Sequence, residues 1–543
     1  MVNPTKASTP VALPFAIDES DFSTWLNSLA TDNEVASCEQ ILQVLQTLNK
    51  THHALASKTR LFFLNKLSQV LFKLTDQLTS APYSIEKTKA YLAIWSCSEL
   101  ANGYILLSEE NRFKTNEYYS AAEKAHIICL ALQALDKVLL YTSQAYAKPY
   151  LYFWIKCYHL YQIAQQEGLT ELTSTSAGAA QPNSWIIDTV FKHILVFSLS
   201  NSNQFTPQEM KQISLFLNTY AGYAKLLNSV PEKKFTGIPA IIFKNDLPPS
   251  ISNATEPSAD EHLLYIATVP VAGKLLEHSA DKNMRFMYGD RHLLQRLAKI
   301  LTLNRHRKHP REPDRSQYFG IIGFTNLVSF YGQHQLGTDQ SLVIGQLDLS
   351  RPGELRELNF EIMPHEKSLD NTLINTYSSK RIKQQRNNKR TEIWDYNKKA
   401  QFEANATQID KSESGYSLIW QDKTTEPRVG DMIGLQNQNP SIGFIRWIAQ
   451  SPTSVLLFGV ELLGINAQAI KIFNTGFPDV QVDAIYITNP VHNTEPNESI
   501  IINNAFSPTE FIFIDDVNKP MRYRIVKQLH TTALLNHLEI TKA

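Results

Sequence analysis

The stretch Asp410-Lys411-Ser412-Glu413-Ser414-Gly415-Tyr416-Ser417-Leu418 decides how the second half of this chain is interpreted. It places a short acidic side chain, a hydroxyl and a glycine within six residues, at a turn between two strand-like runs. Asp410 and Ser412 offer hydrogen bonds, and Gly415 lets the backbone approach a flat ligand. The same residue types also stabilise ordinary β-turns. Taken alone, the stretch predicts a turn, and its surroundings must show whether the turn binds a ligand.

Strand signals follow this turn in close succession. The runs are Gly415 to Trp420, Met432 to Leu435, Ile442 to Ala449 and Val455 to Leu463. Turn residues such as Asn439-Pro440 and Ser451-Pro452 separate them. This spacing predicts a small antiparallel barrel or sandwich. Further strand-like runs continue toward the C-terminus, at Val482 to Ile487, Ser499 to Ile502 and Phe511 to Ile514.

Two basic runs precede the turn. The first, Arg305 to Arg315, follows a helical pattern at about residues 290–303 and contains two prolines that prevent the helix from continuing. It leads into Tyr318 to Phe324, which is rich in β-forming residues. The second, Lys380 to Arg390, lies in a polar stretch at about residues 365–407. That composition predicts an exposed or disordered insertion.

The Asp410 to Gly415 stretch matches the D/N-x-S-x-x-G pattern of the PilZ family, whose members are bacterial receptors for cyclic di-GMP. The runs after it resemble the next strands of that family in the same order: Arg428 to Leu435, Ile442 to Ile448 and Phe458 to Leu463. The resemblance covers about Asp410 to Gly464, roughly a tenth of the chain. It implies a C-terminal antiparallel PilZ-like β-barrel that binds cyclic di-GMP.

The family's other half-site is R-x-x-x-R on a flexible loop ahead of the first strand, and Arg307-Lys308-His309-Pro310-Arg311 fits it. Arg311 and Asp410 lie further apart than the two half-sites of typical PilZ domains. A nearer pair, Arg386 and Arg390, also matches R-x-x-x-R. We favour Arg307 and Arg311, because the residues after Arg390 are too polar to form the first barrel strand. The polar stretch would then loop out of the barrel.

The resemblance implies a ligand site made of Arg307, Arg311, Asp410, Ser412 and Gly415. Guanidinium groups stack on guanine faces and fork onto guanine O6 and N7 or onto phosphate oxygens. Two arginines therefore suit a doubly anionic purine dinucleotide. In this family the ligand is commonly an intercalated dimer.

The first half of the chain has helical periodicity from about Ser37 to Leu227. One apolar stripe consists of Leu64, Leu67, Leu71, Leu74 and Leu78. Thr206-Pro207-Gln208-Glu209 has the residues of a capping box with proline at the first helical position. We expect an all-α region of about seven helices packed in pairs. The aromatic residues between Tyr150 and Gln166 are expected to fill its core.

Length and composition place few limits on function. The 543 residues suggest about three or four folding units. Lys plus Arg and Asp plus Glu both total 52, so no overall charge points to nucleic acid or an anionic membrane. The four cysteines, Cys38, Cys97, Cys129 and Cys157, have no C-x-x-C pair and are expected to be reduced core residues. No apolar stretch of about 18 residues and no signal-peptide pattern is evident, so we expect a cytoplasmic protein without membrane insertion.

The sequence carries none of the common enzyme signatures. We find no phosphate-binding loop, dinucleotide fingerprint, nucleophile elbow or H-E-x-x-H. His306 and His309 lack cysteine or carboxylate partners for a metal and are surrounded by positive charge. We therefore expect no catalytic residue, no metal and no cofactor.

These observations predict an α+β multidomain protein. The expected parts are a flexible segment at 1–35, an all-α domain at 36–230, a mixed connecting segment at 231–303, a PilZ-like barrel at 304–470 with a polar insertion at 365–407, and a β extension at 471–543. The expected function is that of a cyclic di-GMP effector that signals to a protein partner through its helical region. The alternatives are a helical scaffold whose barrel binds no nucleotide, and a nucleic-acid binder that uses the two basic runs.

Overall fold

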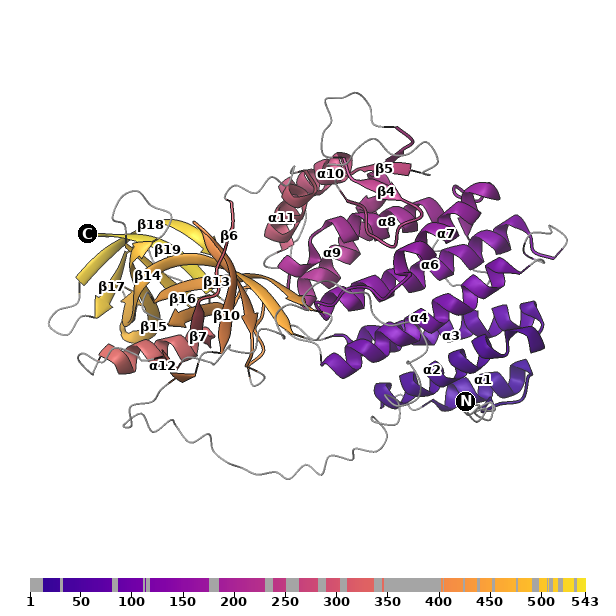
Figure 1. Cartoon of the computed structure of the whole chain (residues 1–543), viewed down its shortest axis with the longest axis horizontal. Helices are drawn as coiled ribbons and strands as arrows, with labels where there is room; N and C mark the ends of the chain where they lie inside the picture. Colours follow the sequence, from indigo (N-terminus) through magenta and orange to yellow (C-terminus); the bar gives the residue numbers. More distant parts are fainter. Residues whose placement is uncertain are drawn as a thin grey trace, which may run out of the picture. The chain divides into compact units, whose positions relative to one another are not determined.

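The computed structural model divides the chain into two compact units, a helical unit at Met1–His306 and a β unit at Arg307–Ala543 (Figure 1). The structure describes residues 13–29, 33–80, 86–110, 113, 118–174, 185–229, 238–250, 263–281, 290–302, 310–335, 344–345, 402–403, 405–422, 425–436, 440–451, 455–474, 477–490, 498–504, 506, 511–515, 521–531 and 535–543. The predicted class, an all-α N-terminal region followed by a C-terminal antiparallel barrel, is confirmed.

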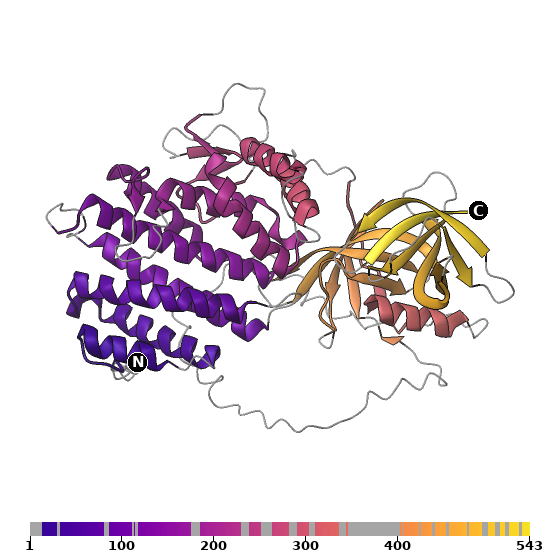
Figure 2. The same cartoon turned by 180° about the vertical axis from the view of Figure 1, so that it is seen from behind.

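Helices stacked side by side form the helical unit (Figures 1 and 2). They are α1 (Glu19–Ser28), α2 (Glu34–Lys50), α3 (Ser57–Leu78), α4 (Lys87–Glu109), α6 (Ala121–Gln144), α7 (Phe153–Gln166), α8 (Ile187–Leu199) and α9 (Pro207–Tyr220). The predicted leucine stripe of α3 is buried. The predicted capping box is present: the Thr206 hydroxyl accepts from the Glu209 amide (3.2 Å), and the Glu209 carboxylate accepts from the Thr206 amide (2.8 Å). All four cysteines are buried free thiols, as expected.

We expected no apolar stretch of about 18 residues, but this unit contains one. Among the described residues, α6 is long and apolar enough to cross a membrane by length and composition alone. Most of it is buried inside the unit, however, where α4, α7, α8 and α9 pack around it. A helix that contacts neighbours on every side is apolar all round, and this accounts for its composition.

The residues expected to form a connecting segment pack against the helices instead. They form β4 (Ala240–Ile242) and β5 (Leu263–Ala267), which pair next to β3 (Lys225–Leu227), then α10 (Val269–Ala280) and α11 (Asp290–Thr302). Their buried side chains join the same hydrophobic core as α2 to α9. Asp246 also caps α7 from a distance in the sequence: its carboxylate accepts from the amides of Tyr152 and of Trp154, the latter at 2.8 Å. A carboxylate at a helix N-terminus satisfies free amides and complements the helix dipole.

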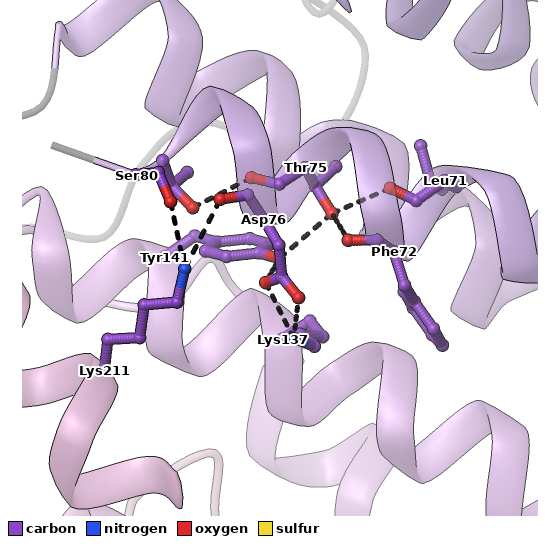
Figure 3. A network of polar contacts seen from close by, with 9 residues as sticks. Leu71, Phe72, Thr75, Asp76, Ser80, Lys137, Tyr141 and Lys211 are labelled. Carbon is purple, nitrogen blue, oxygen red and sulfur yellow. Dashed lines mark hydrogen bonds and ion pairs between the residues drawn. The ribbon is translucent and has the colours of Figure 1, made fainter.

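A polar network joins three helices of this unit (Figure 3). The Asp76 carboxylate on α3 accepts from Lys137 Nζ on α6 at 2.8 and 3.0 Å and from the Tyr141 hydroxyl at 2.9 Å. Lys211 on α9 donates to the Ser80 hydroxyl at 3.1 Å, just beyond the end of α3. The C-terminal end of α3 is therefore held against both α6 and α9.

The β unit contains two closed rings of six strands that share one strand, β14, within its described residues. The first ring runs in the order β7 (Gln317–Ile322), β10 (Ala406–Ser412), β11 (Gly415–Trp420), β14 (Leu456–Asn474), β13 (Ser441–Gln450) and β12 (Met432–Gln436), and back to β7. The second runs in the order β14, β15 (Phe477–Pro490), β16 (Glu498–Asn503), β19 (Leu535–Lys542), β18 (Met521–Thr531) and β17 (Phe511–Asp515), and back to β14. Numbered along the chain, both rings have the strand order 1-2-3-6-5-4.

Helix α12 (Phe324–Gln335) packs where the two rings meet. Leu327 contacts a buried cluster whose members come from both rings: Met432, Ile442, Phe444, Leu463, Ile485, Ile487, Ile501 and Leu535. A side chain on Gly434 would approach the Leu327 side chain to 2.6 Å, so a glycine at this position lets the helix lie close to β12. The second ring has its own core, which includes Ile472, Ile500, Ile512, Tyr523 and Ile540.

Several β segments differ from the sequence-based expectation. β10 begins at Ala406, so Ala406 and Thr407 are strand residues although we assigned them to the polar insertion. β14 continues past Leu463 to Asn474, and the expected boundary at 470 falls inside it. β18 and β19 were not predicted. Short pairs lie outside the rings: β6 (Glu312–Pro313) on β10, β8 (Ile344–Gly345) with β9 (Phe402–Glu403), and, in the helical unit, β1 (Thr173–Ser174) with β2 (Trp185–Ile186).

A buried histidine links three helices of the helical unit. His193 on α8 is 4% exposed. Its Nδ1 lies 2.8 Å from an Asp136 carboxylate oxygen on α6, and its Nε2 lies 2.9 Å from the Ser214 carbonyl oxygen on α9. Both partners can only accept, so both ring nitrogens must carry protons. Burial opposes the charged form, but the charge and hydrogen bond of Asp136 and the Ser214 carbonyl outweigh it and raise the pKa of His193.

We predict that the helical unit loses stability as pH rises through the pKa of His193. Because the folded pKa is raised, the contribution is fully present below the unfolded value of about 6.5 and disappears above the folded one. Far-UV circular dichroism of the full chain during thermal unfolding, at roughly pH 6 to 9, measures this. His193→Gln should abolish that pH dependence. At low pH, Asp136→Ala should cost about 3–5 kcal/mol, because it leaves a buried charge unpaired. An identical pH profile in the wild type and His193→Gln would contradict the assignment.

Candidate functional site

Asp410 and Ser412 lie on β10, at the end that turns into β11. In the register of this hairpin, Asp410 is opposite Ser417 and Ser412 is opposite Gly415. The Ser412 hydroxyl donates to the Gly415 carbonyl oxygen at 3.2 Å, which closes the turn. A bulge between Gln408 and Asp410 shifts the register. Because of this shift, Asp410 shares a face with Ser417, and Gln408 shares the opposite face with Leu418.

Arg311 reaches this hairpin from the basic loop. Its Nη1 donates to Asp410 Oδ1 at 2.6 Å and to the Ser417 hydroxyl. The Arg311 and Asp410 side chains are 26% and 27% exposed, so both reach the surface. The contact joins the arginine half and the turn half of the motif, which are far apart in the sequence.

Backbone pairing fixes the position of Arg311. β6, which follows it directly, pairs with β10 so that Pro313 is opposite Asp410. The Asp314 amide donates to the Ile409 carbonyl at 3.1 Å, and the Asp314 carboxylate lies 3.2 Å from Lys411 Nζ. The end of the basic loop therefore runs along β10 as a short added strand.

The register extends the site across the outer face of the first ring. Asp410 is opposite Ser417, Ser417 is opposite Gly459 on β14, and Gly459 is opposite Trp447 on β13. Residues paired in this way point to the same side of a sheet. Leu418 points to the other side and is fully buried, so the row of Asp410, Ser417, Gly459 and Trp447 faces outward.

Trp447 occupies the space that Gly459 leaves open. A side chain on Gly459 would come within 1.9 Å of the Trp447 indole nitrogen, so the indole lies over the glycine. We did not predict Ser417 or Trp447 as site residues. Ser417 lies seven residues after Asp410 in the predicted hairpin, which is the one signal that the sequence offers for it. The bulge that brings the two side chains to the same face is not visible in the sequence.

The Arg428 to Asp431 turn before β12 has a structural role. The Asp431 carboxylate accepts from the Arg428 amide at 3.0 Å, and Gly430 has a φ of 89° that favours glycine. The Gly430 amide donates to the Ile445 carbonyl at 2.8 Å, which fastens the turn to β13. Burial raises the pKa of Asp431 to about 6, against its hydrogen bond and charge interaction with Arg428. These motif residues hold the barrel and do not lie on the outer row.

The predicted arginines are only partly described. Arg311 contacts Asp410, whereas Arg307, Arg386 and Arg390 lie outside the described residues. Within the part of the chain that the structure describes, no group of three or more His, Cys, Asp or Glu side chains is arranged to hold a metal ion.

Comparison with known protein families shows which family the chain belongs to. Residues 20–232 match the family described as "Cyclic-di-GMP receptor FimW, N-terminal domain", and residues 240–469 match "Cyclic-di-GMP receptor FimW, middle PilZ domain". The chain belongs to the FimW family of cyclic di-GMP receptors. The resemblance to PilZ proteins is thereby confirmed. No curated protein and no solved structure matches the chain.

The limits of the FimW matches differ from the structural units. The match to the middle PilZ domain begins at residue 240, inside the helical unit, and includes β5, α10 and α11, which pack with the helices. It ends at residue 469, inside β14. Residues 470–543, which complete the second ring, lie outside both matches.

The close pairing of two barrel strands explains why the turn motif has a glycine at position 415. A side chain on Gly415 would lie 2.2 Å from the Val460 carbonyl oxygen on β14, and a backbone oxygen cannot move aside cheaply. Gly415 thus allows β11 to approach β14 where the first ring closes. We expected glycine here to let the backbone approach a flat ligand, and the close approach of the two strands is a different physical reason.

We predict that Gly415→Ala destabilises the β unit by at least ~2 kcal/mol, because the new methyl group would overlap the Val460 carbonyl. Urea unfolding of the full chain measures this. Gly332→Ala on α12 is the matched control, since nothing lies within 4 Å of the added atom. Helix propensity predicts that this control is neutral or stabilising by about 0.5–1 kcal/mol. A Gly415→Ala protein as stable as the wild type would show that the strands can separate.

Proposed function

We propose that this chain is a cytoplasmic, non-enzymatic cyclic di-GMP receptor that binds the dinucleotide on the outer face of its first ring. Arg307, Arg311, Asp410, Ser412 and Gly415 would form the site. The observation that carries the proposal is the contact of Arg311 with Asp410 at 2.6 Å, because it unites the two halves of the receptor motif. The four buried free thiols agree with a reducing compartment.

The chemistry of the row suits a guanine base. A carboxylate such as Asp410 accepts from the guanine N1–H and amino group, whereas an arginine donates to O6 and N7. Arg311 and Asp410 present one donor and one acceptor group side by side at the surface. Trp447 offers an aromatic surface on the same row, where a second ring system can stack.

The phosphates of the ligand would be bound by the basic loop. Arg311 is held by β6, while Arg307 stands four positions before it in R-x-x-x-R. Arginine forks pair with phosphate oxygens more strongly than neutral donors do. The segment that carries Arg307 and Arg311 joins the helical unit to the β unit in the sequence, so a ligand bound to both arginines can change how a protein partner binds the helical unit. A ligand can change the conformation of the protein in this way only if it binds one conformation more tightly than the other.

We predict that the purified protein binds cyclic di-GMP without turnover. Calorimetry of the wild type should show saturable binding, and chromatography should show no linear product. Arg307→Ala with Arg311→Ala should weaken binding at least ~100-fold, because charged hydrogen bonds contribute about 1.5–3 kcal/mol each. Asp410→Asn should weaken it about tenfold, since the amide keeps the shape but loses the charge.

The second arginine pair provides the control. Arg386→Ala with Arg390→Ala should change the affinity only by a salt-sensitive few-fold, since a solvated basic segment adds only screened long-range attraction. GTP and cyclic di-AMP test specificity as competitors. If folded wild-type protein gives no heat at high micromolar ligand, the receptor function is wrong. If Arg386 and Arg390 prove essential and Arg307 and Arg311 dispensable, the site must be assigned to the other pair.

A further inference from the structure

A charged cluster crosses the junction between the two rings, close to the proposed site. Arg446 occupies a bulge on β13, between Ile445 and Trp447, where the register with β14 shifts. Its Nε donates to the Glu461 carboxylate on β14. Its Nη1 lies 2.7 Å from His530 Nε2 on β18, which belongs to the second ring. One guanidinium group therefore contacts side chains of both rings.

The protonation of this cluster follows from its donors. A guanidinium group has only N–H donors and cannot accept a hydrogen bond. His530 Nε2 must therefore carry its lone pair toward Arg446, which requires a neutral imidazole. The centroid of the His530 imidazole also lies 5.2 Å from that of the Phe444 side chain, so His530 packs against β13 of the first ring of strands.

The cluster begins one strand away from the ligand turn. Glu461 is opposite Gly415 of β11 in the register. The amide of the next residue, Leu462, donates to the Ser414 carbonyl at 3.0 Å, inside the turn itself. A change in the Ser412 to Gly415 turn therefore acts directly on the β14 residues that hold Arg446.

His530 is in turn connected to the second ring. It is opposite His537 on β19, next to a bulge in β18. His537 Nε2 lies 3.0 Å from the Ser499 hydroxyl on β16. Side-chain contacts thus run from Glu461 through Arg446 to His530, and backbone pairing joins this chain to the ligand turn at one end and to β19 at the other.

We propose that Arg446 couples the cyclic di-GMP site to the second ring, an inference that rests on the proposed function. The Arg446 side chain is 38% exposed and Glu461 is 33% exposed, so both can respond to a ligand on the outer face. The negative phosphates draw the guanidinium group of Arg446 away from His530. The β18–β19 hairpin then loses this polar contact with the first ring, and the second ring becomes the part of the β unit that changes on binding.

The Arg446 side chain is better placed to respond to a ligand than to stabilise the fold. Exposed ion pairs contribute little to stability, because water solvates both charges well. The two apolar clusters, one beneath α12 and one in the second ring, are built from hydrophobic side chains. Loss of this side chain should therefore leave both rings folded and change only the freedom of the hairpin.

Hydrogen exchange of the full chain, followed by mass spectrometry of peptides from β18 and β19, tests the coupling. Saturating cyclic di-GMP should speed exchange in this hairpin about two- to tenfold, the effect of losing one net hydrogen bond on a local opening equilibrium. In Arg446→Gln the exchange should already be fast without ligand. Added ligand should then change it no further, while calorimetry still shows binding.

Two variants of His530 serve as a matched pair. His530→Gln keeps an acceptor for Arg446 and should preserve the slow exchange and its response to ligand. His530→Leu removes the acceptor and should behave like Arg446→Gln. Equal exchange in wild type, Arg446→Gln and His530→Leu without ligand would overturn the proposed connection. Unchanged exchange in wild type with bound ligand would overturn the coupling alone, whereas absence of binding heat in the folded wild type would overturn the receptor function and the coupling with it.

Discussion

The β unit depends on the backbone pairing of one strand, β14. Residues Leu456 to Glu461 pair with β11 on one edge and with β13 on the other, while Lys471 to Asn474 pair with β15 and β17. An unpaired strand edge exposes amides and carbonyls that aggregate or lose their hydrogen bonds, and ring closure removes such edges. A single nineteen-residue strand therefore closes both rings. Neither ring can open at β14 without affecting the other.

This closure also creates the outer row of the candidate site. Asp410, Ser417, Gly459 and Trp447 come from four strands that are adjacent only because β11 meets β14. Gly415 and Gly459 mark the closest approaches, one to a neighbouring backbone and the other to an indole ring. The turn motif thus serves the barrel as well as the proposed ligand, so a variant of its glycine tests folding before it tests binding.

Local sequence patterns predicted those elements whose signal is local. The helices carry apolar stripes and caps, such as Thr206 with Glu209, and these were recognised correctly. The strands from Gly415 to Leu463 alternate between turns and were also predicted. The extent of β10 was not predicted, because its buried Gln408 looks like a loop residue. Its side chain accepts from the Tyr318 hydroxyl at 2.8 Å, on a strand far away in the sequence, and donates to the Asp410 carbonyl at 3.3 Å. The 1-2-3-6-5-4 order of the second ring comes from long-range pairing, for which the sequence shows no repeat.

The sequence predicted the candidate-site residues that belong to a motif. It did not predict those that reach the site only through the register between paired strands. Asp410, Ser412 and Gly415 lie at one turn, and Arg311 joins them because β6 pairs with β10. Ser417, Trp447 and the Arg446 cluster depend on three bulges, after Gln408, Ile445 and Gln528, each of which moves a side chain from one face to the other. A bulge depends on the partner strand, so the sequence of one strand does not reveal it.

The shared strand and the charged cluster connect the two rings in different ways. Ligand binding to the folded first ring stabilises it against unfolding, and this gain extends to the second ring because β14 belongs to both. Release of His530 by Arg446 concerns only the local freedom of the β18–β19 hairpin. Local opening and cooperative unfolding are separate equilibria. A ligand can therefore loosen that hairpin while raising the free energy of unfolding of both rings, which lets the second ring respond to the signal without losing its fold.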